Sequence, residues 1–225
     1  STDDHRVRVV VDNTFLGPVF QQPINHGADL VICSATKYIG GHSDLVAGAC
    51  VGSQEDIARI KSMRGHLGNM IGPWTAWLLL RSLETLKLRM SEQTRNAEHV
   101  ARFLNEHPKV DKVHYLGLLS SENGDRQYEI FQKQCLSPGA MISFEISGGK
   151  EESFRFLNAL KTVKLAVSLG GTESLAQHPA AMTHQGVSQE DKDRLGINDR
   201  MIRLSVGIEA FQDLINDLEQ ALSAA

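Results

Sequence analysis

Two short runs of apolar, largely β-branched residues constrain the fold of this chain more than any other feature. The first, "VRVVVD" over residues 7–12, ends in an acid, and the second, "ADLVICSATK" over residues 28–37, ends in a lysine. Continuous apolar runs of this kind are typical of strands covered on both faces, as in α/β sheets. A buried strand should not end in a lysine such as Lys37 unless the amine is paired or used. The runs therefore predict adjacent strands that bring Asp12 and Lys37 to one edge of a sheet.

The rest of the chain predicts a second, smaller domain. A third strand is expected over residues 45–52, and a helix with a serine cap over residues 53–64. Residues 73–105 predict one very long helix, or two with a bend, linking two domains. Residues 109–225 alternate between strand and helix patterns, which indicates an α+β domain. Strands are expected there over residues 141–146, 166–170 and 201–209, and helices over residues 151–161 and 211–225.

The composition argues against several classes of partner. A net charge of −4 in 225 residues lacks the basic excess typical of a nucleic-acid-binding protein. No apolar run is long enough to span a bilayer, so no membrane partner is expected. Three cysteines without a CxxC pair, Cys33, Cys50 and Cys135, indicate free thiols in a reducing compartment, and we expect a cytoplasmic protein. His178 and His184 lack the spacing of a helical zinc pair, so no metal site is predicted.

Asp12 and Lys37 together match the needs of one cofactor. Pyridoxal phosphate (PLP) needs a lysine amine that forms a Schiff base with its aldehyde and a carboxylate that keeps its ring nitrogen protonated. Ser34 and Thr36 stand just before the lysine and can donate hydrogen bonds to the cofactor phosphate. From the spacing alone, a turn-capping Asp12 and a Lys37 that reaches solvent are the simpler interpretation.

Four segments resemble the Cys/Met-metabolism family of PLP-dependent enzymes. The first covers residues 9–52 and includes "SATKY", and the others are "SLETLKLRM" (residues 82–90), "SLGGTESLAQHPAAMTH" (residues 168–184) and "IRLSVGIE" (residues 202–209). The resemblance implies an α/β enzyme of the aspartate-aminotransferase-like fold (fold type I). Residues 1–82 would be the end of its large, mostly parallel-sheet PLP-binding domain. Residues 83–225 would form the smaller C-terminal α+β domain, reached through the long helix.

The resemblance also implies an assembly and a missing segment. In this family, much of the phosphate cradle and the aromatic residue that stacks on the cofactor ring lie upstream of the segment that matches Asp12. We therefore expect the chain to be the downstream part of a longer polypeptide. The complete protein is expected to be a homotetramer made of two active-site dimers.

The same resemblance assigns roles to single residues. Asp12 would pair with the ring nitrogen, and Lys37 would be the Schiff-base lysine and proton shuttle. Ser34 and Thr36 would contact the phosphate. The remaining assignments concern the substrate: Ser168 would begin the segment that holds its carboxylate and positions the lysine, and Arg203 would bind that carboxylate with its planar fork.

Val167 bears on the choice among the reactions of the family. A valine before Ser168 resembles the methionine γ-lyases and suits the apolar tail of a sulfur amino acid, which favours γ-elimination to an α-keto acid, ammonia and a thiol. Cystathionine γ-lyase, cystathionine γ-synthase and O-acyl-homoserine sulfhydrylase remain alternatives, because "SLGG" resembles synthases and cystathionine lyases as well. A catalytically silent scaffold subunit is the alternative from another class.

Overall fold

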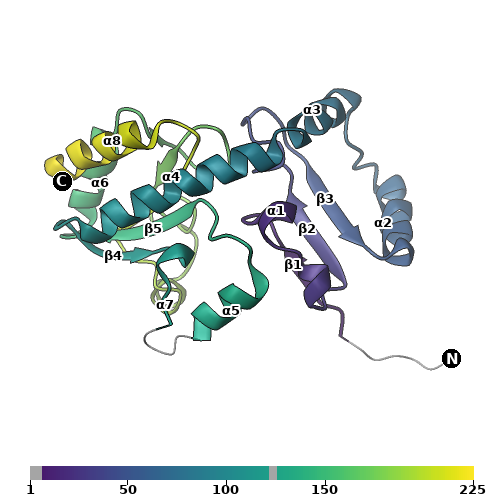
Figure 1. Ribbon diagram of the computed structural model, residues 1–225. Helices are drawn as coiled ribbons and strands as arrows, with labels where there is room; N and C mark the ends of the chain where they lie inside the picture. Colours follow the sequence, from purple (N-terminus) through teal and green to yellow (C-terminus); the bar gives the residue numbers. More distant parts are fainter. Residues whose placement is uncertain (1–6, 122–125) are drawn as a thin grey trace.

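The structure, a computed structural model, describes residues 7–121 and 126–225. Its strands are β1 (Val10–Asp12), β2 (Leu30–Ser34), β3 (Gly48–Gly52), β4 (Val110–His114), β5 (Met141–Ile146), β6 (Lys164–Leu165), β7 (Leu175–Gln177) and β8 (Met201–Ser205). Its helices are α1 (Gly17–Phe20), α2 (Gln54–Leu67), α3 (Pro73–Leu83), α4 (Leu86–Glu106), α5 (Arg126–Gln134), α6 (Lys150–Ala159), α7 (Gln189–Arg194) and α8 (Phe211–Ala224), with 3-10 turns η1 (Pro23–His26) and η2 (Leu116–Leu118). The strands form two sheets, and α4 runs from one toward the other (Figure 1).

The first sheet has the order β1-β2-β3, with β1 parallel and β3 antiparallel to β2. All three strands predicted from the apolar runs are present, although each is shorter than its run. The sheet is mixed rather than mostly parallel, and the expected burial of both faces is wrong in this structure. Val10, Ile32 and Val51 are 52%, 40% and 60% exposed. The physical reason is that the described elements which pack on this sheet of three short strands cover only part of its faces.

The helices that follow β3 along the chain confirm two sequence-based predictions. The side chain of Ser53 caps α2 by accepting a hydrogen bond from the backbone N–H of Asp56. The long helical pattern is divided into two helices, α3 and α4, with the break at Glu84 and Thr85. None of the helices that the structure describes is both long and apolar enough to cross a membrane.

The second sheet has the order β4-β5-β8-β7-β6, and only the β6–β7 pair is parallel. Helices α4, α6 and α8 pack together against it (Figure 1). The core between these helices and the sheet includes side chains that are at most 1% exposed, among them Ile142, Phe144, Phe156, Ile202 and Leu218. This core fixes the sheet from which the loops of the candidate site emerge.

One predicted strand of this second sheet is wrong. Residues 166–170 ("AVSLG") lie in a loop that follows the short strand β6. Ser168 has φ +91° and Gly170 has φ +78°, and a strand cannot continue through this left-handed backbone. Strands β4 and β7 were not predicted, because polar residues interrupt the apolar pattern of β4 ("VDKVH") and β7 has three residues.

Candidate active site

Lys37 lies in a tight turn rather than in a strand. β2 ends at Ser34, and the backbone N–H of Lys37 donates to the carbonyl of Ser34 at 3.1 Å. The N–H of Gly41 in turn donates to the carbonyl of Lys37 at 2.7 Å. The turn therefore fixes the backbone on both sides of Lys37 and leaves its side chain half-buried.

Asp12 and Ser34, at the ends of two paired strands, are joined by a residue that the sequence analysis missed. The hydroxyl of Thr14 donates to Asp12 Oδ1 at 2.6 Å and accepts from the N–H of Ser34 at 2.8 Å. The N–H of Thr14 also donates to Asp12 Oδ1, at 2.9 Å. A threonine two residues after an aspartate is the only sequence signal for this arrangement, which is a common turn motif.

Thr36, expected at the phosphate, bonds the backbone of Ala47. Its hydroxyl accepts a hydrogen bond from the N–H of Ala47 at 3.0 Å and lies 3.3 Å from the carbonyl of Ala47. Because a hydroxyl has a single proton, Thr36 can donate either to this carbonyl or to another acceptor. The long contact to the carbonyl is the weaker of its two bonds.

Lys37, Ser168 and Arg203, which lie far apart in the sequence, meet in the structure. Lys37 Nζ donates to Ser168 Oγ at 2.9 Å. The guanidinium of Arg203 donates to the backbone carbonyl of Ser168, also at 2.9 Å. The side-chain oxygen of Gln177, in the amide orientation that satisfies both groups, accepts from Arg203 at 3.0 Å. Sequence analysis missed Gln177, because nothing in its segment indicates an arginine partner.

The surroundings of Lys37 make its amine a better nucleophile. Burial lowers the pKa of the Lys37 ammonium below the ordinary lysine value, and the positive charge of Arg203 lowers this pKa further. A lower pKa increases the fraction of neutral amine near neutral pH, and neutral amine is the form that attacks a carbonyl.

Val167 precedes Ser168 in the loop and is 51% exposed. It is thus the residue next in sequence to the serine that Lys37 contacts. An apolar side chain there offers no hydrogen-bond partner to a charged ligand group.

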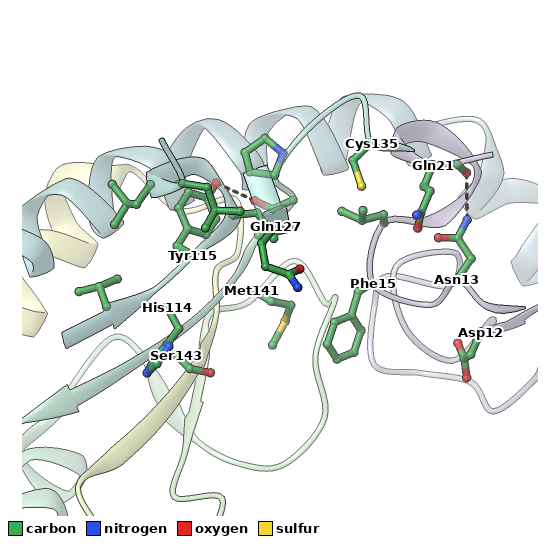
Figure 2. Close-up of a pocket in the computed structure, with 18 of the residues that line it drawn as sticks. Asp12, Asn13, Phe15, Gln21, His114, Tyr115, Gln127, Cys135, Met141 and Ser143 are labelled. Carbon is green, nitrogen blue, oxygen red and sulfur yellow. Dashed lines mark hydrogen bonds between the residues drawn. The ribbon is translucent and has the colours of Figure 1, made fainter. Parts of the chain in front are cut away.

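A cavity beside Asp12 is a different feature from this set of contacts. It has a volume of about 740 Å³ and lies between the β1–α1 segment and the β4–β5 strands. Figure 2 shows Phe15 and Met141 at its opposite walls and Asp12 at one edge. Lys37 and Arg203 do not line it. The candidate site is therefore defined by contacts among side chains and not by the volume of a cavity.

The structure joins the predicted site residues into one series of contacts. Thr14 links Asp12 to Ser34, the turn links Ser34 to Lys37, and Lys37 touches Ser168, which Arg203 holds. Carboxylate, amine, hydroxyls and guanidinium are the groups that bind PLP and an amino acid. This donor set fits the cofactor that the sequence predicts. Within the described residues, no group of three or more His, Cys, Asp and Glu side chains could hold a metal ion.

Comparison with known proteins points to the same cofactor. A model of the family described as "Cys/Met metabolism PLP-dependent enzyme" matches residues 2–223. The chain is 47% identical to an L-methionine γ-lyase of Fusobacterium nucleatum, with 95% of this chain and 54% of that protein covered. It is 46% identical to an L-methionine γ-lyase of Pseudomonas putida, with 98% and 55% covered. It is also 46% identical to a cystathionine γ-lyase of Mus musculus, with 96% and 54% covered. The chain thus spans about half the length of these relatives.

The solved structures include a cystathionine γ-synthase from Xanthomonas oryzae in complex with aminoacrylate and cysteine. It has a TM-score of 0.91 and 42% identity, and the match covers 97% of this chain and 56% of that one. The same TM-score, identity and coverage relate the chain to a cystathionine γ-lyase of Micromonospora echinospora. At these values, the chain resembles this lyase and this synthase equally in backbone structure.

Proposed function

This chain belongs to the Cys/Met-metabolism family of PLP-dependent enzymes, and from that premise we propose that it carries the catalytic lysine of a sulfur amino-acid enzyme acting at the γ-carbon. The observation that carries the proposal is the 2.9 Å contact between Lys37 Nζ and Ser168 Oγ. This contact supports the proposal that Lys37 supplies a reactive amine beside the loop that Arg203 holds.

Each residue of the site has one proposed task. When bound, PLP supplies an aldehyde for a lysine amine and a ring that withdraws electrons from the substrate Cα. Asp12 would keep the ring nitrogen protonated through its carboxylate, which Thr14 orients. Ser34 and Thr36 would donate hydrogen bonds to the phosphate, Thr36 by exchanging its contact with the carbonyl of Ala47.

The proton transfers are assigned to Lys37. Arg203 would bind the substrate α-carboxylate, and its present hold on Ser168 keeps the guanidinium next to the lysine. Lys37 Nζ would then remove the proton from Cα and return a proton as the γ-substituent leaves. For methionine the balance is methionine plus water giving α-ketobutyrate, ammonia and methanethiol.

Val167 supports methionine or a similar neutral thioether as the substrate. An apolar side chain offers the distal ammonium of cystathionine no hydrogen bond or ion pair, so it gives this substrate no advantage over a neutral thioether. The alternatives are a cystathionine γ-lyase, a cystathionine γ-synthase or an O-acyl-homoserine sulfhydrylase. The likeness to the Xanthomonas oryzae γ-synthase supports γ-replacement as the second candidate reaction.

We propose the fold type I architecture together with this function. The division into residues 1–82 and 83–225 is supported by the break between α3 and α4 near its boundary. A homotetramer of two active-site dimers is proposed for the complete protein, and sedimentation velocity tests it. A cytoplasmic location is proposed with it, since Cys33, Cys50 and Cys135 are all free thiols.

Release of α-keto acid from different amino acids tests the proposed reaction. The holoprotein should release keto acid from methionine with a higher kcat/KM than from cystathionine. A preference for cystathionine would favour a cystathionine lyase, and thioether formation from a homoserine ester without keto acid would favour γ-replacement. A colourless protein that binds no PLP would instead indicate a silent scaffold.

A further inference from the structure

Three buried polar side chains lie along one stripe of helix α4. Arg89, Gln93 and Asn96 follow one another at helical spacing, and their exposures are 5%, 0% and 0%. Burying such groups is costly unless they form hydrogen bonds, so their partners reveal what the stripe does.

Arg89 holds the turn that follows Lys37. Its guanidinium donates to the carbonyl of Tyr38 at 2.8 Å and to the carbonyl of Ile39 at 3.3 Å. A third bond, at 2.9 Å, reaches the carbonyl of Ser82 at the end of α3. The fork of one arginine thus fixes the backbone directly after the proposed catalytic lysine.

Gln93 holds the loop that carries Ser168. One turn of helix beyond Arg89, its amide nitrogen donates to the carbonyl of Gly171 at 2.6 Å. A backbone bond of 3.0 Å from Thr172 to the carbonyl of Gly41 joins this loop to the lysine turn. Neighbouring residues of one rigid helix therefore hold both sides of the Lys37–Ser168 contact.

Asn96 extends the same arrangement to the strand that carries Arg203. Its amide nitrogen donates to the carbonyls of Gly207 at 3.1 Å and Glu209 at 2.7 Å. Both carbonyls follow the end of β8, the strand that contains Arg203. The stripe thus bonds the three segments that supply the lysine, the serine and the arginine of the site.

We propose that α4 aligns these three segments and that Gln93 is a positioning residue for the contact between Lys37 and Ser168. The inference rests on the proposed function, because it concerns the same site. The two segments that meet there are a turn and a loop, whose relative position depends on individual hydrogen bonds. A displacement of about 1 Å at a reacting group can cost a hundredfold in rate.

The test compares Gln93→Met with Thr94→Val. Both substitutions exchange a buried polar side chain of α4 for an apolar one of similar size. Thr94 is 7% exposed and, within the described part of the chain, its hydroxyl makes no hydrogen bond, so it serves as the matched control. Amide hydrogen exchange on the apoprotein and keto-acid release per bound PLP on the holoprotein are measured for both.

In Gln93→Met, peptides covering residues 168–172 should exchange about tenfold faster than in Thr94→Val, with α8 unchanged. The rate of turnover per bound PLP should fall by about tenfold to hundredfold. Unchanged exchange would overturn the proposal. Faster exchange with normal turnover per bound PLP would overturn it too, because Gln93 would then serve stability alone.

Two further outcomes are covered by the design. If Gln93→Met does not fold, Gln93→Asn replaces it in the test, since asparagine keeps the amide but is one methylene too short to reach Gly171. Faster exchange over residues 168–172 together with lower turnover per bound PLP in Gln93→Asn would support the proposal, and the absence of these two changes would overturn it. If the wild type binds no PLP and releases no keto acid, the proposed function fails. The exchange data still decide whether Gln93 holds the loop.

Discussion

Lys37 Nζ lies 2.9 Å from Ser168 Oγ although the two residues are separated by 131 positions in the sequence. Ser168 reaches this position through a backbone with φ +91°, which side-chain-bearing residues rarely adopt. Two of the bonds that hold the loop lie next to Ser168: Arg203 donates to the carbonyl of Ser168, and the N–H of Gly170 donates to Ser205 Oγ at 2.9 Å. Such strain costs about 1–3 kcal/mol and is common at functional sites.

Two substitutions at Ser168 separate the hydroxyl from the strain. Ser168→Ala removes the hydroxyl and keeps the strained side chain, whereas Ser168→Gly removes both. Each should lower kcat/KM by about tenfold to hundredfold, because a hydrogen bond to a charged group is lost. Ser168→Gly should be more stable in urea than Ser168→Ala by about 1 kcal/mol. Wild-type activity in either variant, or the opposite order of stability, would refute the account of this residue.

Gly170 gives a prediction about the stability of the same loop. A Cβ at this position would lie 2.6 Å from the backbone nitrogen of Tyr38, and its φ is +78°. Gly170→Ala should therefore lower the free energy of unfolding by about 2 kcal/mol or more. Gly186→Ala is the control, since nothing lies within 4 Å of its added Cβ, and it should change stability by less than about 0.5 kcal/mol. Equal effects of the two substitutions in urea unfolding would contradict the structure of the loop.

The sequence predicted the strands and helices of this fold better than the burial of their side chains. The apolar runs predicted β1, β2 and β3, and helical spacing predicted one very long helix or two with a bend, of which the structure has the second, α3 and α4. Residues 166–170 were misassigned because "AVSLG" has the composition of a strand, and the left-handed backbone of Ser168 is imposed by tertiary contacts. The exposure of Val10 could not be predicted from an apolar run, since burial depends on what covers a strand.

For the site, the sequence supplied the residue types, and the resemblance to the family assigned each residue its group on the cofactor or the substrate. Asp12 and Lys37 could be identified as strand-end charges, but nothing local indicates that Lys37 meets Ser168 or that Arg203 meets Gln177. These contacts join distant parts of the chain, and a single sequence does not record them. Thr14 was accessible in principle, because an aspartate followed two residues later by a threonine favours the turn that is observed.

The lowered pKa of Lys37 predicts a pH dependence of stability in the apoprotein. Burial and then the charge of Arg203 lower the pKa of the folded state below the unfolded value of about 10.5. Between these two values the unfolded chain binds more protons, so the free energy of unfolding should rise with pH across this window. Lys37→Met lacks this contribution.

Urea unfolding of wild type and Lys37→Met at several alkaline pH values measures the effect. All other groups titrate in both proteins, so the difference between their free energies of unfolding isolates Lys37. The free energy of unfolding of the wild type should increase relative to that of Lys37→Met as the pH rises toward about 10.5. A constant difference would show that the pKa of Lys37 is ordinary, and a falling one would show that it is raised.

Val167→Glu should shift the choice of substrate. A carboxylate beside Ser168 would offer a partner to the distal ammonium of cystathionine, and one charge-assisted contact contributes about 1.5–3 kcal/mol. The ratio of kcat/KM for cystathionine over methionine should therefore rise by about tenfold to hundredfold. Val167→Gln is the control of equal shape without charge and should give a much smaller rise. Equal ratios for the two variants, from keto-acid release, would remove Val167 from the account of specificity.

The central claim is that Lys37 is the residue to which PLP attaches, and covalent trapping tests it most directly. Borohydride reduction of the holoprotein fixes the cofactor on the amine that holds it, and peptide mapping by mass spectrometry then locates the added pyridoxyl mass. The account predicts this mass on the peptide that contains Lys37, and loss of both the label and nearly all turnover in Lys37→Ala. A label on any other lysine, or an active holoprotein with no label at Lys37, would contradict it.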